Sequence, residues 1–126
     1  MKLIKAHAFG NDFLLIDAYD FSGIADPLAC AREVCDRHRG IGADGLIVFE
    51  TRPAGASMQL FNADGSRSEV SGNGVRCLAA WIASTQNLEK GTFVDIETDA
   101  LEDGVVERVQ QRQTDITQTH DGNFHN

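Results

Sequence analysis

The chain has 126 residues, of which 42% are hydrophobic and 24% are charged, and its formal net charge is −8 at pH 7. This length and composition predict a single domain that can bury a core, and the negative charge argues against nucleic acid and anionic membrane surfaces as partners. The sequence contains neither a recognisable signal peptide nor an apolar run long enough to span a bilayer.

The first part of the chain predicts two strands joined by a turn. Residues 2–7 alternate weakly between polar and apolar side chains, and residues 13–16 form a continuous apolar run, which is typical of a strand covered on both faces. A turn at residues 10–12 lies between them, in which Asn11 either supplies the turn or orients a polar ligand. Residues 20–26 are expected to form a loop.

An amphipathic helix is predicted over residues 27–38. The Asp-Pro pair at residues 26–27 is typical of a helix start, and Gly40 is typical of a helix end. A glycine-rich segment then precedes a buried strand at residues 46–49. This order differs from the dinucleotide-binding fingerprint, in which the glycines follow a strand and precede a helix.

The most informative stretch is residues 60–82, LFNADGSRSEVSGNGVRCLAAWI. Asn62 begins a strong turn signal, and a loop that contains Gly72 and Asn73 then leads into a helix. Exposed backbone N–H groups and the positive end of the helix dipole favour a small site for a carboxylate or another anion. The alternative is a hairpin, a loop and a core helix that bind no ligand.

The helix that follows this loop is apolar on nearly all sides. One face at helical spacing is formed by Val75, Leu78, Ala79 and Ile82. A helix of this kind is buried on most faces. We therefore expect strands to wrap around this helix.

The composition of the C-terminal segment is distinctly polar. Strands are predicted at residues 93–96 and 105–106, but residues 107–126 contain few apolar side chains and many Gln, Thr and Asp. Such a segment buries little surface. We assign residues 1–106 to the domain and expect residues 107–126 to be a disordered or loosely attached tail.

The cysteines and histidines show no disulfide or metal-binding pattern. Cys30, Cys35 and Cys77 lack Cys-x-x-Cys spacing, which indicates reduced core thiols in a cytoplasmic protein. No metal site is predicted, because His120 and His125 lack a third ligand at suitable spacing.

Four dispersed segments share their order and spacing with one known family. They are FGNDF at residues 9–13, DRHRGIGADGL at residues 36–46, FNADGSRSEVSGNGVRC at residues 61–77 and, more weakly, ETDA at residues 97–100. In these segments the chain resembles the pyridoxal-independent diaminopimelate epimerases, over residues 1–105. The resemblance implies an isomerase of lysine biosynthesis that converts LL- to meso-diaminopimelate without any cofactor, be it pyridoxal, metal or nucleotide.

The resemblance also implies an α+β fold, in which a mixed β-sheet is wrapped around a central helix, and a site. Members of the family have two similar domains, each a mixed β-sheet around a central helix, with the substrate between them. A cysteine at the N-terminus of one central helix removes the α-proton as a thiolate, and its counterpart returns a proton to the opposite face. Carried over by position, Asn11 and Asn62 orient the amino and carboxylate groups of the substrate. Gly72 and Asn73 supply loop N–H groups to that carboxylate.

Two departures from the family pattern matter. Ser71 occupies the position of the catalytic cysteine, and a serine hydroxyl is a poor base without an activating partner. Cys77 lies six residues later, inside the helix, and is no substitute. The chain also matches only the first of the two domains. We therefore expect an epimerase that is impaired as written, with Asp44 shaping its loop and an apolar patch exposed around residues 71–74 and Asn11.

Two alternatives stay open at the level of sequence. One is a non-catalytic amino-acid-binding module of the same fold that self-associates, so that a homodimer imitates the two-domain cleft. The other is a related isomerase that acts on a different amino acid. All three interpretations have a small amino acid as the ligand, with neither nucleic acid nor membrane as a partner.

Overall fold

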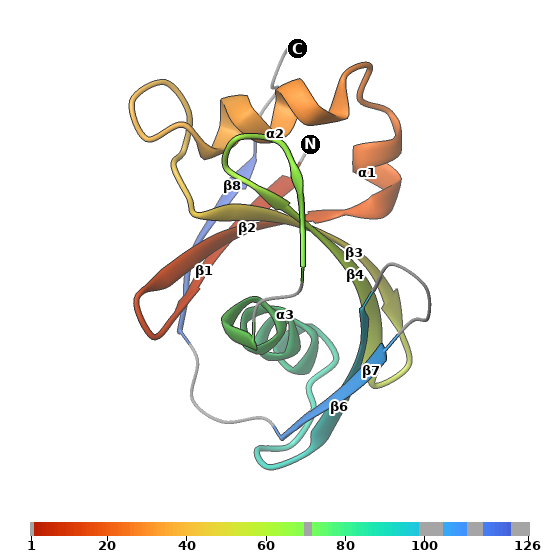
Figure 1. The fold of residues 1–126 in the computed structure, drawn as a ribbon. Coiled ribbons are helices and arrows are strands. Elements are labelled where there is room, and N and C mark those ends of the chain that lie inside the picture. The colour runs from red at the N-terminus through yellow and green to blue at the C-terminus, as the bar shows by residue number, and fades with distance from the viewer. Residues whose placement is uncertain (1, 70–71, 99–104, 111–114, 122–126) are drawn as a thin grey trace.

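The computed structural model describes residues 2–69, 72–98, 105–110 and 115–121, and Figure 1 labels its helices and strands. The N-terminal elements are β1 (Lys2–Ala8), β2 (Asn11–Asp17), α1 (Ala18–Ser22) and α2 (Pro27–Cys35). The central elements are β3 (Gly45–Arg52), β4 (Gly55–Asn62), β5 (Arg67–Ser68) and α3 (Gly72–Thr85). The last three strands are β6 (Phe93–Thr98), β7 (Val105–Gln110) and β8 (Asp115–Asp121).

The strands form one mixed sheet in the order β7-β6-β4-β3-β2-β1-β8, with the short β5 paired to β4. β2 and β3 run parallel, as do β4 and β6, and the other neighbouring pairs run antiparallel. The sheet curls around α3, while α1 and α2 lie on its outer side (Figure 1). The predicted α+β fold, a mixed sheet wrapped around a central helix, is confirmed.

Two hydrophobic cores lie on opposite faces of the sheet. The inner core packs α3 against the strands and includes Leu15 and Leu78. The outer core packs α2 against the other face and includes Leu14 and Leu46. Because neighbours along a strand point to opposite faces, the apolar run at residues 13–16 is buried on both sides, as predicted.

The central helix α3 is buried along most of its length, which agrees with its nearly uniform apolar character. Val75, Leu78 and Ile82 have at most 1% of their surface exposed. Gly72 and Asn73, which were expected in a loop before the helix, belong to its first turn, where Gly72 is exposed and Asn73 is partly buried. The middle of α3 therefore belongs to the core, whereas its N-terminus is accessible.

The N-terminal half differs from the sequence-based expectation in two places. The turn between β1 and β2 lies at Phe9 and Gly10, which have φ angles of 49° and 85°, so Asn11 is the first residue of β2. A short helix, α1, occupies part of the expected loop. It is capped by Asp17, whose carboxylate accepts a hydrogen bond from the backbone N–H of Tyr19 at 2.8 Å.

The start of α2 agrees with the prediction, but its end does not. Asp26 is the N-cap, as expected. The helix ends at Cys35, three residues before the predicted end, because Asp36 has an extended backbone conformation. Its carboxylate accepts hydrogen bonds from the backbone N–H groups of His38 and Arg39, which stabilise a turn in place of another helical turn.

The C-terminal segment differs most from the prediction. Residues 107–110 belong to β7 beside β6, so a boundary after residue 106 falls within a strand, and residues 115–121 form β8 beside β1. The expectation of a disordered tail is wrong for these two stretches, while residues 111–114 and 122–126 lie outside the described residues. Pairing with an open sheet edge relies on backbone hydrogen bonds and needs few apolar side chains.

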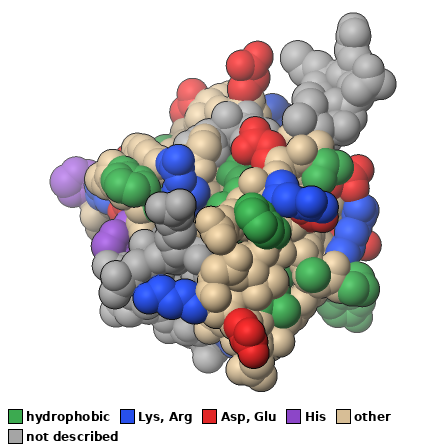
Figure 2. Space-filling model, turned by 90° about the horizontal axis from the view of Figure 1, so that it is seen from below, with side chains coloured by type: hydrophobic (Ala, Val, Ile, Leu, Met, Phe, Trp, Pro, Cys, Tyr) green, Lys and Arg blue, Asp and Glu red, His purple; other side chains and the backbone are tan. Residues whose placement is uncertain are grey.

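Large hydrophobic side chains are exposed at scattered positions, namely Phe9, Tyr19, Leu28, Phe93 and Val106. On the described part of the face in Figure 2, hydrophobic side chains lie apart, with charged side chains between them. Single exposed hydrophobic residues are ordinary on protein surfaces. Within the described ranges, every helix falls short of the length and apolar character needed to cross a membrane.

Candidate functional site

One end of the sheet gathers several residues that the sequence analysis singled out. β2 begins at Asn11, β3 begins at Gly45, and β4 ends at Asn62. The strand register places Gly45 between Phe13 and Asn62, so these strand ends lie side by side. The first turn of α3 reaches the same end, because the Asn73 side chain contacts Asn11.

A direct hydrogen bond joins two of the predicted site residues. Nδ2 of Asn73 donates to Oδ1 of Asn11 at 2.6 Å, and this contact is partly buried. Nη1 of Arg76 donates in turn to Oδ1 of Asn73 at 3.1 Å. The Arg76 guanidinium also lies over the ring of Phe9, 5.3 Å from its centroid. The turn before β2 and the first turns of α3 are thereby tied together.

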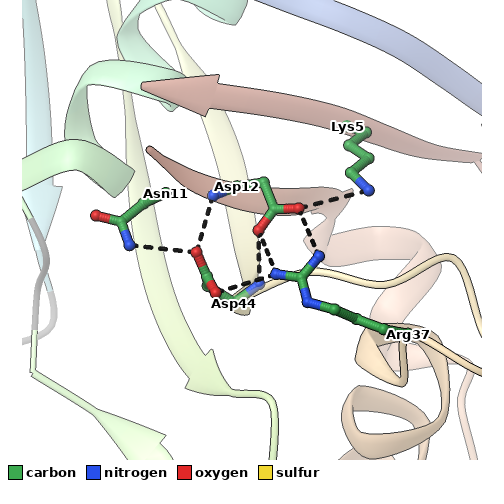
Figure 3. A network of polar contacts seen from close by, with 5 residues as sticks. All are labelled: Lys5, Asn11, Asp12, Arg37 and Asp44. Carbon is green, nitrogen blue, oxygen red and sulfur yellow. Dashed lines mark hydrogen bonds and ion pairs between the residues drawn. The ribbon is translucent and has the colours of Figure 1, made fainter. Parts of the chain in front are cut away.

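A charged network supports Asn11 from the other side (Figure 3). Nδ2 of Asn11 donates to Oδ2 of Asp44 at 3.2 Å, and this oxygen also accepts the backbone N–H of Asp12 at 3.0 Å. Arg37 donates to the two Asp12 oxygens at 2.8 and 3.0 Å and to Oδ1 of Asp44 at 3.1 Å. Lys5 forms an ion pair with Asp12 at 3.5 Å. Two cations balance two carboxylates, which suits a structural role for the network.

The network favours the ionised form of Asp12. The hydrogen bonds from Arg37 are the main cause that holds the pKa of the Asp12 carboxyl well below its usual value of 3.8, and partial burial opposes this shift. The same hydrogen bonds raise the pKa of Arg37 above its usual range. Both side chains are therefore charged at neutral pH.

We expect Asp12→Asn to remove a pH-dependent part of the stability. Because the folded-state pKa lies below the unfolded one, ionised Asp12 stabilises the fold above about pH 4, and this contribution is lost as the pH falls toward the folded-state pKa. At neutral pH the free energy of unfolding of the variant should be about 1–2 kcal/mol lower than that of the parent. The loss is this small because Arg37 is exposed and water screens its charge. Urea unfolding between neutral pH and about pH 2.5 should show the difference from the parent shrinking in acid.

Glu50→Gln is the control for this pH dependence, because Glu50 is an exposed carboxylate on β3. At neutral pH its free energy of unfolding should stay within about 0.5 kcal/mol of that of the parent. A difference between Asp12→Asn and the parent that stays constant into acid would contradict the lowered pKa of Asp12.

The other predicted site residues have separate surroundings. Nδ2 of Asn62 donates to Oγ of Ser66 at 3.0 Å, and the backbone N–H of Asn62 donates to the Ser66 carbonyl at 2.8 Å, within the turn that follows β4. Gly72 is the exposed first residue of α3, at the end of the helix where N–H groups lack intrahelical acceptors. Ser71, the predicted catalytic position, lies outside the described residues, and its role stays a prediction.

All three cysteines are buried and free. Desolvation raises the pKa of Cys77 to about 12, with a smaller effect from the charge of Asp12. Burial likewise raises the pKa of Cys35 to about 12 and raises that of Cys30. These thiols are protonated at neutral pH, and Cys77 belongs to the inner core, as predicted. No cluster of three or more His, Cys, Asp or Glu among the described residues is suited to hold a metal ion.

Sequence reasoning missed the charged partners of the site. The local patterns assign Asp12 to a turn and Arg37 to a helix end, although the two side chains form one ion pair across 25 residues. Arg76 follows Asn73 by three residues, a spacing that makes side chains neighbours on a helix, but the expected loop left Asn73 outside the helix, whereas α3 begins at Gly72. The density of charged residues between residues 36 and 44 is the one local signal for the network.

Comparison with known proteins places the chain in a family. The family model described as diaminopimelate epimerase matches residues 3–118. The diaminopimelate epimerase of Moorella thermoacetica is 43% identical over 99 residues, which cover 78% of this chain and 35% of the relative. That of Synechocystis sp. is 42% identical over 95 residues, which cover 74% of this chain and 34% of the relative.

The fold is also similar to that of a solved structure, the phenazine biosynthesis protein of the PhzF family from Bacillus anthracis. The match has a TM-score of 0.59 and 18% sequence identity and covers 87% of this chain and 35% of that chain, which shows a likeness of fold alone. The chain spans about a third of the length of the curated relatives it matches. On the strength of the family match over residues 3–118 and of these relatives, the chain belongs to the diaminopimelate epimerase family.

Proposed function

We propose that the chain carries one side of the active site of an amino-acid epimerase that interconverts LL- and meso-diaminopimelate in lysine biosynthesis. The observation that carries the proposal is the contact between Asn11 and Asn73 at the N-terminus of α3. In the family pattern, both positions face the substrate. The names of the matched relatives support diaminopimelate as that substrate, and the three free cysteines support a cytoplasmic location.

The proposed reaction inverts one stereocentre by the loss and return of a proton. A base takes the α-proton, the electron pair of the C–H bond moves into the α-carbon and its carboxylate, and an acid returns a proton on the opposite face. N–H groups and the positive dipole at the start of α3 stabilise the negative charge that the carboxylate gains. Asn11, held by the side chain of Asn73, orients the amino acid at this helix end.

Ser71 weakens this chemistry in the sequence as it stands. A serine hydroxyl is far less acidic than a thiol and needs an activating base. The buried thiol of Cys77 offers no replacement, because its pKa is raised to about 12. Position 71 directly precedes Gly72, the first residue of α3, and a helix N-terminus lowers the pKa of a nearby thiol.

We expect Ser71→Cys to accelerate exchange of the α-proton. The parent chain and the variant are each incubated with meso-diaminopimelate in heavy water, and deuterium at the α-carbon is followed by mass spectrometry. A positioned general base contributes about 100-fold or more, which is the expected gain in the exchange rate. Ser84→Cys is the matched control, because it adds a thiol at an exposed position near the other end of α3, and it should exchange no faster than the parent.

Two results would count against a catalytic role for this chain. If neither the parent, which has Ser71, nor the Ser71→Cys variant exchanges the α-proton, the chain does not assemble a working base. Equal acceleration by Ser71→Cys and Ser84→Cys would mean that any accessible thiol suffices and that the N-terminus of α3 contributes nothing.

A second candidate function is non-catalytic binding of an amino acid by a self-associating module of the same fold. Ser71 and the burial of all three thiols favour this candidate, because they leave a binding site without a ready base. Sedimentation equilibrium over a wide concentration range tests the association. A dimer that binds meso-diaminopimelate without exchange would support it, and a monomer at high concentration would contradict it.

A further inference from the structure

The amides of Asn11 and Asn73 belong to a continuous chain of four side chains. At one end, Oδ2 of Asp44 accepts a hydrogen bond from Nδ2 of Asn11 at 3.2 Å. Oδ1 of Asn11 then accepts one from Nδ2 of Asn73 at 2.6 Å, and Oδ1 of Asn73 accepts one from Nη1 of Arg76 at 3.1 Å. All three hydrogen bonds therefore run in the same direction, from Arg76 to Asp44.

The two ends of this chain have a fixed hydrogen-bonding polarity. A carboxylate only accepts hydrogen bonds, and a guanidinium only donates them. The amide of an asparagine does both, and rotation of the group by about 180° exchanges its donor and its acceptor. Asp44 therefore selects the NH2 side of Asn11, and Arg76 selects the oxygen of Asn73.

The orientation that Asp44 imposes on the Asn11 amide is compatible with the one that Arg76 imposes on the Asn73 amide. With its nitrogen turned to Asp44, Asn11 points its oxygen at Asn73. With its oxygen turned to Arg76, Asn73 points its nitrogen at Asn11. Rotation of either amide alone would bring two donors or two acceptors face to face, both between the amides and at the charged end.

Further contacts hold both ends of the chain in place. Asp44 accepts hydrogen bonds from the backbone N–H of Asp12 at 3.0 Å and from Arg37 at 3.1 Å (Figure 3). Arg76 lies over the ring of Phe9. The two selecting groups are thus anchored on different parts of the fold, the loop before β3 and the first half of α3.

We infer that Asp44 and Arg76 are positioning residues that fix the orientation of the Asn11 and Asn73 amides. The consequence for substrate rests on the proposed function, in which the Asn11 amide orients an amino acid and Asn73 lies beside it. Amides that are already oriented lose little freedom when the ligand binds, so the site is organised in advance. The orientation itself is a property of the unliganded chain and is measurable without any reaction.

The side-chain NH2 signals of the 15N-labelled chain test this inference. In the parent, one NH2 proton of Asn11 and one of Asn73 should exchange with water at least about tenfold more slowly than those of Asn87, an exposed residue after α3. Arg76→Gln replaces a group that only donates with one that also accepts, whereas Arg76→Lys keeps a group that only donates. Arg76 is exposed, so both variants should fold.

The inference expects different results from the two Arg76 variants. Arg76→Gln should raise the exchange rate of the protected Asn73 proton by about fivefold or more, and Arg76→Lys should retain the parent pattern. Asp44→Asn should affect the Asn11 signals in the same way as Arg76→Gln affects those of Asn73. Unchanged Asn73 signals in Arg76→Gln, or an equal loss of protection in both Arg76 variants, would overturn the inference. Backbone signals show whether Asp44→Asn is folded. If it is not, the comparison of Arg76→Gln with Arg76→Lys tests the inference.

A titration with meso-diaminopimelate separates this inference from the proposed function. If the parent binds the amino acid, Arg76→Gln should weaken binding by about tenfold and Arg76→Lys by less than about twofold. Equal affinity of the parent and Arg76→Gln would overturn the link between amide orientation and binding. Absence of binding to the parent would count against the proposed function, whereas the NH2 signals would still decide the positioning roles of Asp44 and Arg76.

Discussion

Leu78→Ala should destabilise the chain by about 3–4 kcal/mol. Leu78 lies in the middle of α3, is 0% exposed and belongs to the inner core. Truncation removes buried contacts and leaves a cavity between the helix and the sheet that curls around it, which cannot close fully. Domains of this kind are stable by only about 5–15 kcal/mol, so the loss is a large part of the total.

Urea unfolding followed by circular dichroism measures the effect of Leu78→Ala. Ser84→Ala is the matched control, because Ser84 is exposed on the same helix, and its change should stay within about 0.5 kcal/mol. A loss smaller than about 1 kcal/mol for Leu78→Ala would contradict the central position of α3 in the core.

Gly40→Ala should also be strongly destabilising, by about 3 kcal/mol. A Cβ atom at this position would lie 2.0 Å from the carbonyl oxygen of Glu33 and 2.8 Å from that of Val34. Both oxygens are backbone atoms near the end of α2, so they cannot rotate away as a side chain would. The N–H groups of Ile41 and Gly42 also donate to the Val34 carbonyl, each at 3.0 Å. Relief of the clash would therefore pull the loop off the helix end.

Gly23→Ala is the matched control for this substitution. Gly23 also follows a helix, but its φ is −83°, and the nearest atom to an added Cβ would be the Asp20 carbonyl oxygen at 3.7 Å, an ordinary contact. Alanine there restricts the unfolded chain and should change stability by about 0 to +1 kcal/mol. Thermal unfolding of the two variants measures the contrast, and equal stability would contradict the close approach at Gly40.

Local patterns predicted the core of this fold well. The apolar run at residues 13–16 indicated a strand covered on both faces, and the structure places its side chains in the two cores. The nearly uniform apolar character of residues 75–83 indicated the buried central helix. Such predictions succeed because the face of an element that is buried can be recognised from the spacing of its apolar residues.

The same patterns failed where an element depends on a distant partner. The polar composition of residues 115–121 indicated a loose tail, whereas the structure pairs them with β1. The end of α2 was predicted too late, because the cap formed by Asp36 competes with one more helical turn. Within the site, the family resemblance pointed to Asn11 and Asn73 but not to the contact between them.

By itself, the sequence determined the positions of the apolar strands and of the buried helix, because the burial of an element is reflected in the local spacing of its apolar residues. Only the tertiary structure decided which polar side chains meet. Asp12 pairs with Arg37 across 25 residues, and Asn11 pairs with Asn73 across 62 residues. These contacts depend on the register of β2 beside β3 and on the position of the N-terminus of α3 inside the curled sheet. A hydrogen bond between residues so far apart leaves no periodic signal along the chain.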